Sequence, residues 1–399
     1  MGINQVPGII GWMHDSAAAI VVDGEIIASA EEERFNRIRH SSGRPEKAIA
    51  YCLKESNLTL SDIDVVAIAN NPWAPFRRLR INLHPINFLR DVINVIAFEY
   101  YRRRLKTETD AKIIFVDHHL AHAASAYLCS GQDEVNVLTI DGSGETESFA
   151  FFVGKAGRLK RIWDIPLGSI FAKKKWHSIG GVYSRLTSFL KLGVQAEGKT
   201  MGLASYGESR FDFSKILHIK KHNDYVVDRR KISELYSAYE RKSKSDPLTQ
   251  EHKDLAASLQ KALEVSVVNL AREAYEYNQV GHFAFAGGVT LNCNTNTEVL
   301  LQDFCDSLFI QPAANDGGLA LGAALFAAGE VGEAKTQRLA HAYYGPGFTN
   351  DEIETLLKEA KVPYRKTDQI AADTAALIAD GKIVGWFQGR MEMGPRALG

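Results

Sequence analysis

The sequence predicts an α/β fold built from two related halves. Short apolar runs typical of strands alternate with longer runs of helical periodicity, and one arrangement of strands and turns occurs twice. The chain has 399 residues, enough for two or three domains, and its 45% hydrophobic and 24% charged residues are usual for a globular protein.

The first copy of the repeated unit lies near the N-terminus. We expect strands at residues 6–12, 17–22 and 25–30. Asp23-Gly24 is a residue pair preferred in two-residue hairpin turns, so it joins the second and third strands.

The second copy repeats this order. We expect strands at residues 136–140, 148–153 and 158–165, with a polar turn at 141–145 and a glycine turn at 154–157. Strand, polar turn, strand, glycine turn and strand is the ground plan of the actin-like ATPases, a ribonuclease H-like fold in which two α/β halves clamp a nucleotide. The order of elements therefore predicts this duplicated fold.

Helices and one buried strand complete the first domain. Apolar residues at helical spacing predict a helix over residues 254–277, and a strand at 282–286 precedes a helix at 319–328. Gly345-Pro346-Gly347 marks a linker, so we place one domain at residues 1–338 and a second at 339–399.

The second domain begins with a new pattern. We expect helices at residues 351–360 and 370–380 and a strand at 382–387. Between the two repeated units, residues 71–106 are rich in arginine. This segment is either an anion-binding or interface element, or an inserted surface helix with a solvated basic face, and we favour the second interpretation.

Charge and cysteine content limit the class of protein. The net charge of −1 gives no reason to expect nucleic acid or a membrane as a partner. We see no leader-like segment and no apolar run long enough to span a bilayer. The cysteines lack CxxC spacing and are expected to be free thiols, so we expect a cytoplasmic protein: Cys52, Cys129, Cys293 and Cys305.

A histidine pair is the strongest local signal for chemistry. His118 and His122 are four residues apart, so on a helix they share one face and could bind one metal ion; the alternative is a histidine-rich helix start without ligands. Asp141, which opens a glycine-rich turn, and Asp316, which precedes a helix, could complete the site, although each residue type is also common in caps and turns. Two imidazoles and two carboxylates favour iron(II), manganese or zinc over magnesium or calcium.

Several small-residue segments could approach a phosphate or nucleotide. The candidates are Gly142, Ser143 and Gly144 in the first segment, Gly287, Gly288 and Asn292 in the second, and Lys199 in the third. Small residues would let the backbone approach an anion or a nucleotide closely. The alternative interpretation is an ordinary hairpin for the first segment, a strand-to-helix turn for the second and a helix start with surface charges for the third.

Two further groups could act on a substrate. His14, with Asp15 beside it, could take a proton from an attacking hydroxyl, or it could serve only as a hydrogen-bonding turn residue. Arg390 and Arg396 suit a planar anion such as carbamoyl phosphate or a nucleotide phosphate.

Taken together, these segments resemble the NodU/CmcH family of carbamoyltransferases, which carbamoylate nodulation factors and antibiotics. The resemblance covers essentially the whole chain, and Arg39 stands where many relatives carry lysine. The family pattern continues past Gly399, so we expect further sequence there. The segments that carry the resemblance are GWMHDSA at 11–17, EEERF at 31–35, HHLAHA at 118–123, EGKTMGLA at 197–204, GGVTLN at 287–292, NDGG at 315–318 and GPRALG at 394–399.

The resemblance implies two catalytic domains. The first is similar to the actin-like ATPase of tRNA threonylcarbamoyl-adenosine synthesis, and it would hold a divalent transition metal through the His118, His122, Asp141 and Asp316 set, with iron(II) favoured over manganese or zinc. The second, YrdC-like and here truncated, would begin with Arg390 and Arg396 and would make carbamoyl-adenylate from carbamoyl phosphate and ATP. The carbamoyl group would then pass to a hydroxyl of a sugar or natural-product acceptor.

Other functions remain open at this point. An actin-like small-molecule kinase would release ADP instead of AMP and pyrophosphate and would need no histidine pair. A tRNA-modifying protein or a nucleotide-binding scaffold is a further alternative, and the near-neutral charge argues against tRNA. We expect a small-molecule acceptor without nucleic acid or membrane, a homodimer is compatible with the sequence, and this chain alone is expected not to complete the reaction.

Overall fold

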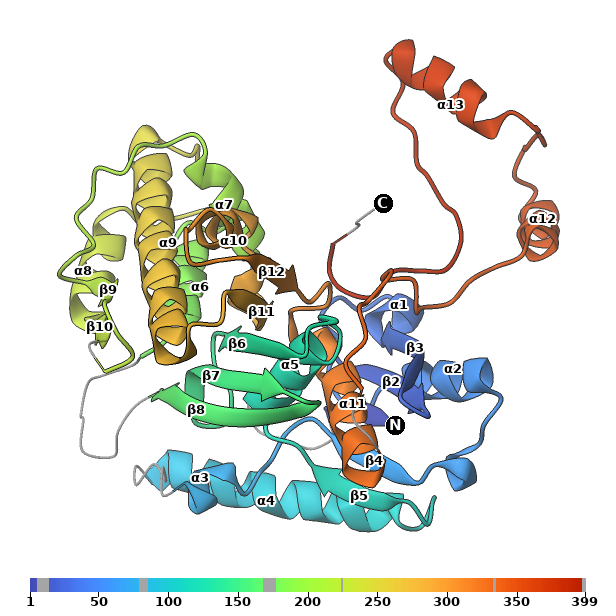
Figure 1. Ribbon diagram of the computed structural model, residues 1–399. Helices are drawn as coiled ribbons and strands as arrows, with labels where there is room; N and C mark the ends of the chain where they lie inside the picture. The colour runs from blue at the N-terminus through green and yellow to red at the C-terminus, as the bar shows by residue number, and fades with distance from the viewer. Residues whose placement is uncertain (6–13, 79–84, 168–176, 224, 333–334, 397–399) are drawn as a thin grey trace.

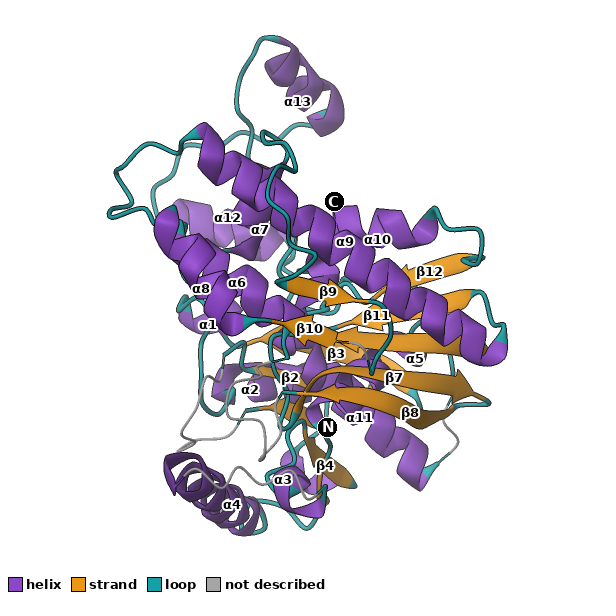
Figure 2. Ribbon diagram, turned by 90° about the vertical axis from the view of Figure 1, so that its left-hand side faces the viewer, coloured by secondary structure: helices purple, strands orange, loops and turns teal. Residues whose placement is uncertain are grey.

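The computed structural model contains two five-stranded sheets with helices between and around them (Figures 1 and 2). It describes residues 1–5, 14–78, 85–167, 177–223, 225–332 and 335–396. The predicted strand at residues 6–12 therefore lies outside the described residues.

The first sheet has the order β3-β2-β1-β4-β5. β1 pairs antiparallel with β2 and parallel with β4, so a meander of three strands continues into a parallel edge. Its strands are β1 (Gly2–Asn4), β2 (Ala17–Val22), β3 (Glu25–Glu31), β4 (Val65–Ile68) and β5 (Lys112–Phe115).

The second sheet repeats this topology as β8-β7-β6-β11-β12. β6 pairs antiparallel with β7 and parallel with β11, as β1 does with β2 and β4. The predicted α/β duplication is confirmed, and the shared strand order is that of the actin-like ATPases. The strands are β6 (Glu134–Ile140), β7 (Glu147–Lys155), β8 (Arg158–Pro166), β11 (His282–Ala286) and β12 (Ser307–Ile310).

Two helices lie between the sheets (Figure 1). α5 (His118–Tyr127) packs on β6, β7 and β11 of the second sheet, and α11 (Leu319–Val331) packs on β1, β2 and β4 of the first. The two helices also pack closely on each other, because Gly322 leaves no side chain in the contact: a Cβ there would lie 1.8 Å from the carbonyl oxygen of Ala121. This contact holds the two halves together.

The outer faces of the sheets are covered by further helices. α2 (Glu46–Ser56) and α4 (Pro85–Leu105) bury Ile49, Phe98 and Tyr101 with the first sheet. α9 (Gln250–Asn278) lies across the second sheet and buries a row of leucines there. The other helices are α1 (Glu33–Asn36), α3 (Ala74–Arg77), α6 (Ile179–Phe189), α7 (Glu197–Ala204), α8 (Arg229–Ala238) and α10 (Cys293–Leu300), and a small hairpin consists of β9 (Leu217–Ile219) and β10 (Tyr225–Val227).

The C-terminal segment differs in character from the rest. α12 (Asn350–Glu359) and α13 (Ile370–Ala379) contain no buried residue and stand away from the two sheets (Figure 1). The predicted strand at 382–387 is wrong: these residues have no regular structure, because no described strand pairs with their backbone. The chain then returns to the core around α5 and α11, where Met393 is buried. No described helix is long and apolar enough to cross a membrane.

Candidate metal centre and its surroundings

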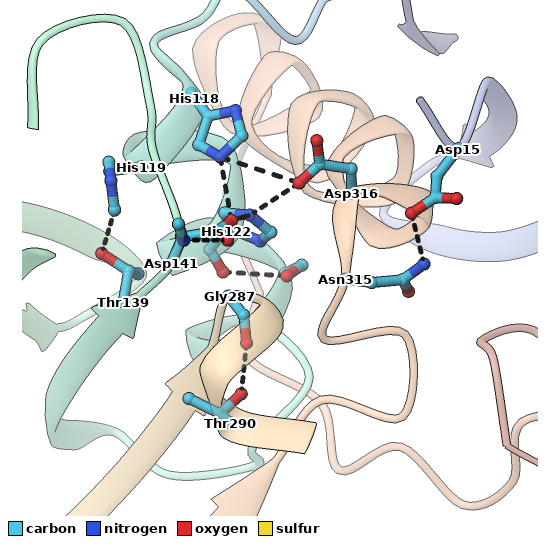
Figure 3. A network of polar contacts seen from close by, with 12 residues as sticks. Asp15, His118, His119, His122, Thr139, Asp141, Gly287, Thr290, Asn315 and Asp316 are labelled. Atoms are coloured by element: carbon cyan, nitrogen blue, oxygen red, sulfur yellow. Dashed lines mark hydrogen bonds and ion pairs between the residues drawn. The ribbon is translucent and has the colours of Figure 1, made fainter. Parts of the chain in front are cut away.

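The structure brings the four predicted metal ligands together (Figure 3). Asp141 Oδ2 lies 3.2 Å from His118 Nε2 and 3.1 Å from His122 Nε2. Asp316 Oδ1 lies 3.8 Å and 3.6 Å from the same two nitrogens. One donor atom from each residue therefore lies within 4.8 Å of every other, a spacing that can hold one ion.

The fold explains how residues so distant in sequence meet. His118 and His122 are on consecutive turns of α5, and Asp141 directly follows β6, on which α5 packs. Asp316 begins the short 3-10 helix Asp316–Gly318 that leads into α11. Because α5 and α11 pack against each other between the sheets, the end of β6 and the start of α11 both point at the histidines.

Electrostatics also favours a cation at this centre. Burial lowers the pKa of His118, but the carboxylates of Asp316 and Asp141 outweigh it and raise this pKa to about 10. Burial raises the pKa of Asp141, but its hydrogen bonds with the two histidines hold it well below its usual value. The acidic residues therefore attract positive charge, and the two-imidazole, two-carboxylate set fits a divalent transition metal.

Residues that the sequence did not single out hold the ligands in place. Both carboxylate oxygens of Glu145 accept from the backbone N–H of His118, at 2.9 and 3.1 Å, and one also accepts from Asn71 N–H at 2.8 Å. His119 turns away from the centre and bonds Thr139 Oγ1 at 2.7 Å (Figure 3). The only available signal for Glu145 was its place at the end of the Asp141 turn.

His14 and Asp15 lie beside the candidate metal centre. His14 Nδ1 is 3.0 Å from Asp15 Oδ2 and 4.0 Å from Asp316 Oδ2. Burial lowers the pKa of His14, but the carboxylates of Asp316 and Asp15 outweigh it and raise this pKa to about 9. The geometry therefore places an imidazole close to the four-residue cluster.

The two predicted glycine turns lie next to each other at this centre. Gly287 has φ +98, and a Cβ there would lie 2.3 Å from Ile140 O, so only glycine allows β11 and β6 to approach so closely. Gly288 is beside Asp141, since a Cβ on it would lie 3.2 Å from Asp141 Oδ1. Ser143 and Gly144 line a cavity described below, whereas a Cβ on Gly142 would meet nothing within 4 Å.

Two other predicted nucleotide contacts have structural partners. The Asn292 side chain caps α10 by accepting from Thr295 N–H at 3.1 Å, and it also bonds Gln260. Lys199 Nζ donates to Leu192 O at 3.0 Å. A nucleotide role for either residue stays a prediction.

A cavity of about 280 Å³ opens at the candidate metal centre. His118, Asp316 and Glu145 line it. The arginine-rich segment lines it too, through Arg90 and Asp91, which pair at 2.9 Å. That segment therefore contributes to the wall of the site as well as to the surface.

The two C-terminal arginines lie in different surroundings. Arg390 donates to Gly345 O at 3.0 Å and to Tyr51 Oη at 2.9 Å, and its guanidinium is 3.3 Å from Glu55. The Arg396 guanidinium lies against α7, 2.8 Å from where a Cβ on Gly198 would be. Arg390 therefore ties the C-terminal segment to α2, and an anion-binding role for either residue stays a prediction.

The chain is similar in sequence to proteins of known class. A family model described as carbamoyltransferase N-terminus matches residues 5–325, and one described as carbamoyltransferase C-terminus matches residues 375–399. Nodulation protein NolNO of Sinorhizobium fredii (strain NBRC 101917 / NGR234) is 37% identical over 97% of this chain. The chain spans 58% of the length of NolNO.

Two further proteins extend the comparison. The 3'-hydroxymethylcephem-O-carbamoyltransferase of Streptomyces clavuligerus is 25% identical over 97% of this chain and 70% of its own length. Among solved structures, component A of the Acidaminococcus fermentans (R)-2-hydroxyglutaryl-CoA dehydratase aligns with a TM-score of 0.44 at 15% identity, over 82% of this chain and 97% of that one. Because the N-terminal family model spans most of the sequence, the chain belongs to the NodU/CmcH-type carbamoyltransferase family.

Proposed function

We propose that this chain transfers a carbamoyl group from carbamoyl-adenylate to a hydroxyl of a small-molecule acceptor. The observation that carries the proposal is the cluster of His118, His122, Asp141 and Asp316 with His14 beside it, in a member of a carbamoyltransferase family. Carbamoyl phosphate and ATP would supply the adenylate through a YrdC-like domain that begins in residues 339–399.

The chemistry requires activation of both reactants. A carbamoyl group is a poor electrophile, so its attachment to AMP provides a good leaving group. In the transfer step the acceptor oxygen bonds to the carbamoyl carbon, the bond to the phosphate oxygen of AMP breaks, and the acceptor proton leaves. The products are a carbamate ester, AMP and one proton.

His14 would accept the proton of the acceptor hydroxyl. Nδ1 of His14 donates to the carboxylate of Asp15, so Nε2 of the neutral ring can accept the proton of the hydroxyl. The raised pKa of His14 opposes this role while Asp316 and Asp141 carry uncompensated charge. A divalent cation between the same carboxylates would lower this pKa again, because its positive charge opposes them.

The metal ligands and the glycine turns would organise the electrophile. An ion held by His118, His122, Asp141 and Asp316, with iron(II) favoured, would polarise the carbamoyl or phosphate oxygen. The turn at Gly142, Ser143 and Gly144 and the turn at Gly287 and Gly288 lie close enough to that centre to receive phosphate and adenosine against the backbone.

Metal content is the first test. We expect about one iron, manganese or zinc per chain by mass spectrometry of protein purified without oxygen, and loss of that metal in Asp316→Asn. Equal metal content in the two proteins would reject the proposed metal site.

Transfer is the second test. We expect AMP release from preformed carbamoyl-adenylate, with 3'-hydroxymethylcephem as the hydroxyl probe, and a much lower rate in His14→Ala. A wild-type rate in His14→Ala would reject the base assignment. ADP formation from ATP in the presence of the probe would instead indicate a kinase.

A further inference from the structure

Asp15 is the point where three segments of the chain meet beside the metal centre. Its Oδ2 accepts from His14 Nδ1 at 3.0 Å and from Asn315 Nδ2 at 2.9 Å. Its Oδ1 bonds His40 Nδ1 at 2.7 Å. Because a carboxylate can only accept in these bonds, His14 and His40 each carry a proton on Nδ1.

His40 is built to hold that carboxylate. The backbone N–H of His40 donates to Glu33 Oε2 at 2.7 Å, which fixes the loop that presents the ring. The ring Nε2 of His40 is buried and has no hydrogen-bond partner among the described residues. The bond to Asp15 is thus the polar contact that accounts for the position of this ring.

Both partners have unusual backbone conformations. Asp15 has φ +59 and His40 has φ +53, in the left-handed region that residues other than glycine seldom occupy. Such conformations persist where surrounding structure enforces them, often at functional sites. The two strained residues contact each other and lie next to the predicted base, so their conformations serve one common arrangement.

The orientation of Asp15 decides which way His14 faces. Asp316 Oδ2 lies 4.0 Å from the same Nδ1 that bonds Asp15, so two carboxylates are available to one N–H. If the Asp15 carboxylate rotated away, His14 could turn toward Asp316 instead, and Nε2 would leave its position. His40 and Asn315 prevent that rotation by holding one Asp15 oxygen each.

A cation bound by Asp15, Glu33 and His40 is the other arrangement that this spacing allows. However, both Asp15 oxygens already accept N–H groups, so hydrogen bonding fully accounts for the cluster.

We propose that His40 is a positioning residue that, through Asp15, holds His14 with Nε2 directed at the acceptor hydroxyl. The proposal rests on the proposed function, since it gives His40 a role in the same proton transfer. His40 itself takes no part in the chemistry and does not contact substrate through Nδ1.

Two conservative substitutions of His40 distinguish the roles of its two ring nitrogens. In His40→Asn the amide nitrogen is the same number of bonds from the backbone as Nδ1, so the bond to Asp15 is kept. In His40→Gln the amide nitrogen corresponds in reach to Nε2, so that bond is lost. The assay is AMP release from preformed carbamoyl-adenylate with 3'-hydroxymethylcephem, beside wild type and His14→Gln, with unfolding midpoints as a check on the fold.

We expect His40→Gln to lower kcat roughly 10–100-fold, as loss of a supporting hydrogen-bond partner commonly does, with KM for the probe unchanged. We expect His40→Asn to stay within about threefold of wild type. A wild-type kcat in His40→Gln, an equal loss in His40→Asn, or a loss confined to KM would overturn the positioning role while leaving His14 as the base. A wild-type kcat in His14→Gln would instead reject the base, and with it the role of His40.

Discussion

The contact between α5 and α11 offers a direct way to disturb the proposed metal centre from a distance. In Gly322→Ala the new Cβ would lie 1.8 Å from Ala121 O and 3.1 Å from Ser125 Cβ. Ordinary contacts begin near 3.4 Å, so the two helices must separate by more than an ångström. Overpacking of this kind costs about 1–3 kcal/mol in the free energy of unfolding.

The same separation should weaken metal binding. His118 and His122 are on α5, and Asp316 begins the 3-10 helix that leads into α11, so the shift moves the histidines away from one carboxylate. Metal–ligand distances tolerate only about 0.2 Å of change. We therefore expect metal affinity to fall roughly 10–100-fold, although residue 322 is not a ligand.

Urea unfolding and competition with a chelator measure the two effects. Gly202→Ala is the matched control, because a Cβ there would meet nothing within 4 Å and the residue lies inside α7. We expect this control to gain up to about 1 kcal/mol of stability and to keep its metal affinity. If Gly322→Ala matched wild type in stability and metal affinity, the account of the helix contact would be refuted.

Two further predictions concern pH. Burial raises the pKa of Glu147, but His119 and the guanidinium groups of Arg161 and Arg78 together hold it well below its usual value. The stabilising effect of the Glu147 carboxylate is therefore present above the unfolded pKa of about 4.3 and is lost as pH falls. Urea unfolding should show Glu147→Gln to be about 3–5 kcal/mol less stable than wild type at pH 7, and the variant should lose less stability than wild type on acidification. If the stability of both proteins depended equally on pH, this carboxylate would be excluded as the cause of the acid sensitivity. Since the pKa of His118 is raised to about 10 in the absence of an ion, a metal must displace the proton of this histidine. Zinc affinity, measured with a competing chelator, should therefore rise up to about tenfold per pH unit from pH 6.5 to 8.5. A zinc affinity that does not change with pH would contradict proton competition.

Local patterns in the sequence predicted much of the fold. The hairpin turn at Asp23-Gly24 and the alternation around it predicted β2 and β3 to within one residue. Helical spacing predicted α12 and α13 to within one residue, because the apolar positions of a helix can be read from the chain itself. The predictions for α9 and α11 were short by four residues at the start and three at the end, respectively. The prediction of a strand at 382–387 was wrong because a strand also requires a second strand to pair with, and a single sequence does not reveal that partner.

The candidate site was predictable only in part for the same reason. His118 and His122 were visible as a pair four residues apart, and Asp141 and Asp316 as acids at the ends of elements. Nothing in the local sequence indicated that His40 and Asn315 would both bond Asp15, since these contacts join segments up to 300 residues apart. The contact of Asn315 with Asp15 forms because the segment before α11 lies against the first sheet.

That return has a consequence for synthesis. The inner face of the first sheet, formed largely within the first 115 residues, is covered by α11, and a Cβ on Gly2 would lie 1.8 Å from Ala320 O. A nascent chain that has not yet reached residue 331 would therefore present this apolar face to solvent and to chaperones. The inner face of the first sheet is therefore covered only after residue 331 has left the ribosome, whereas the core that this sheet forms with α2 and α4 needs only the first 115 residues.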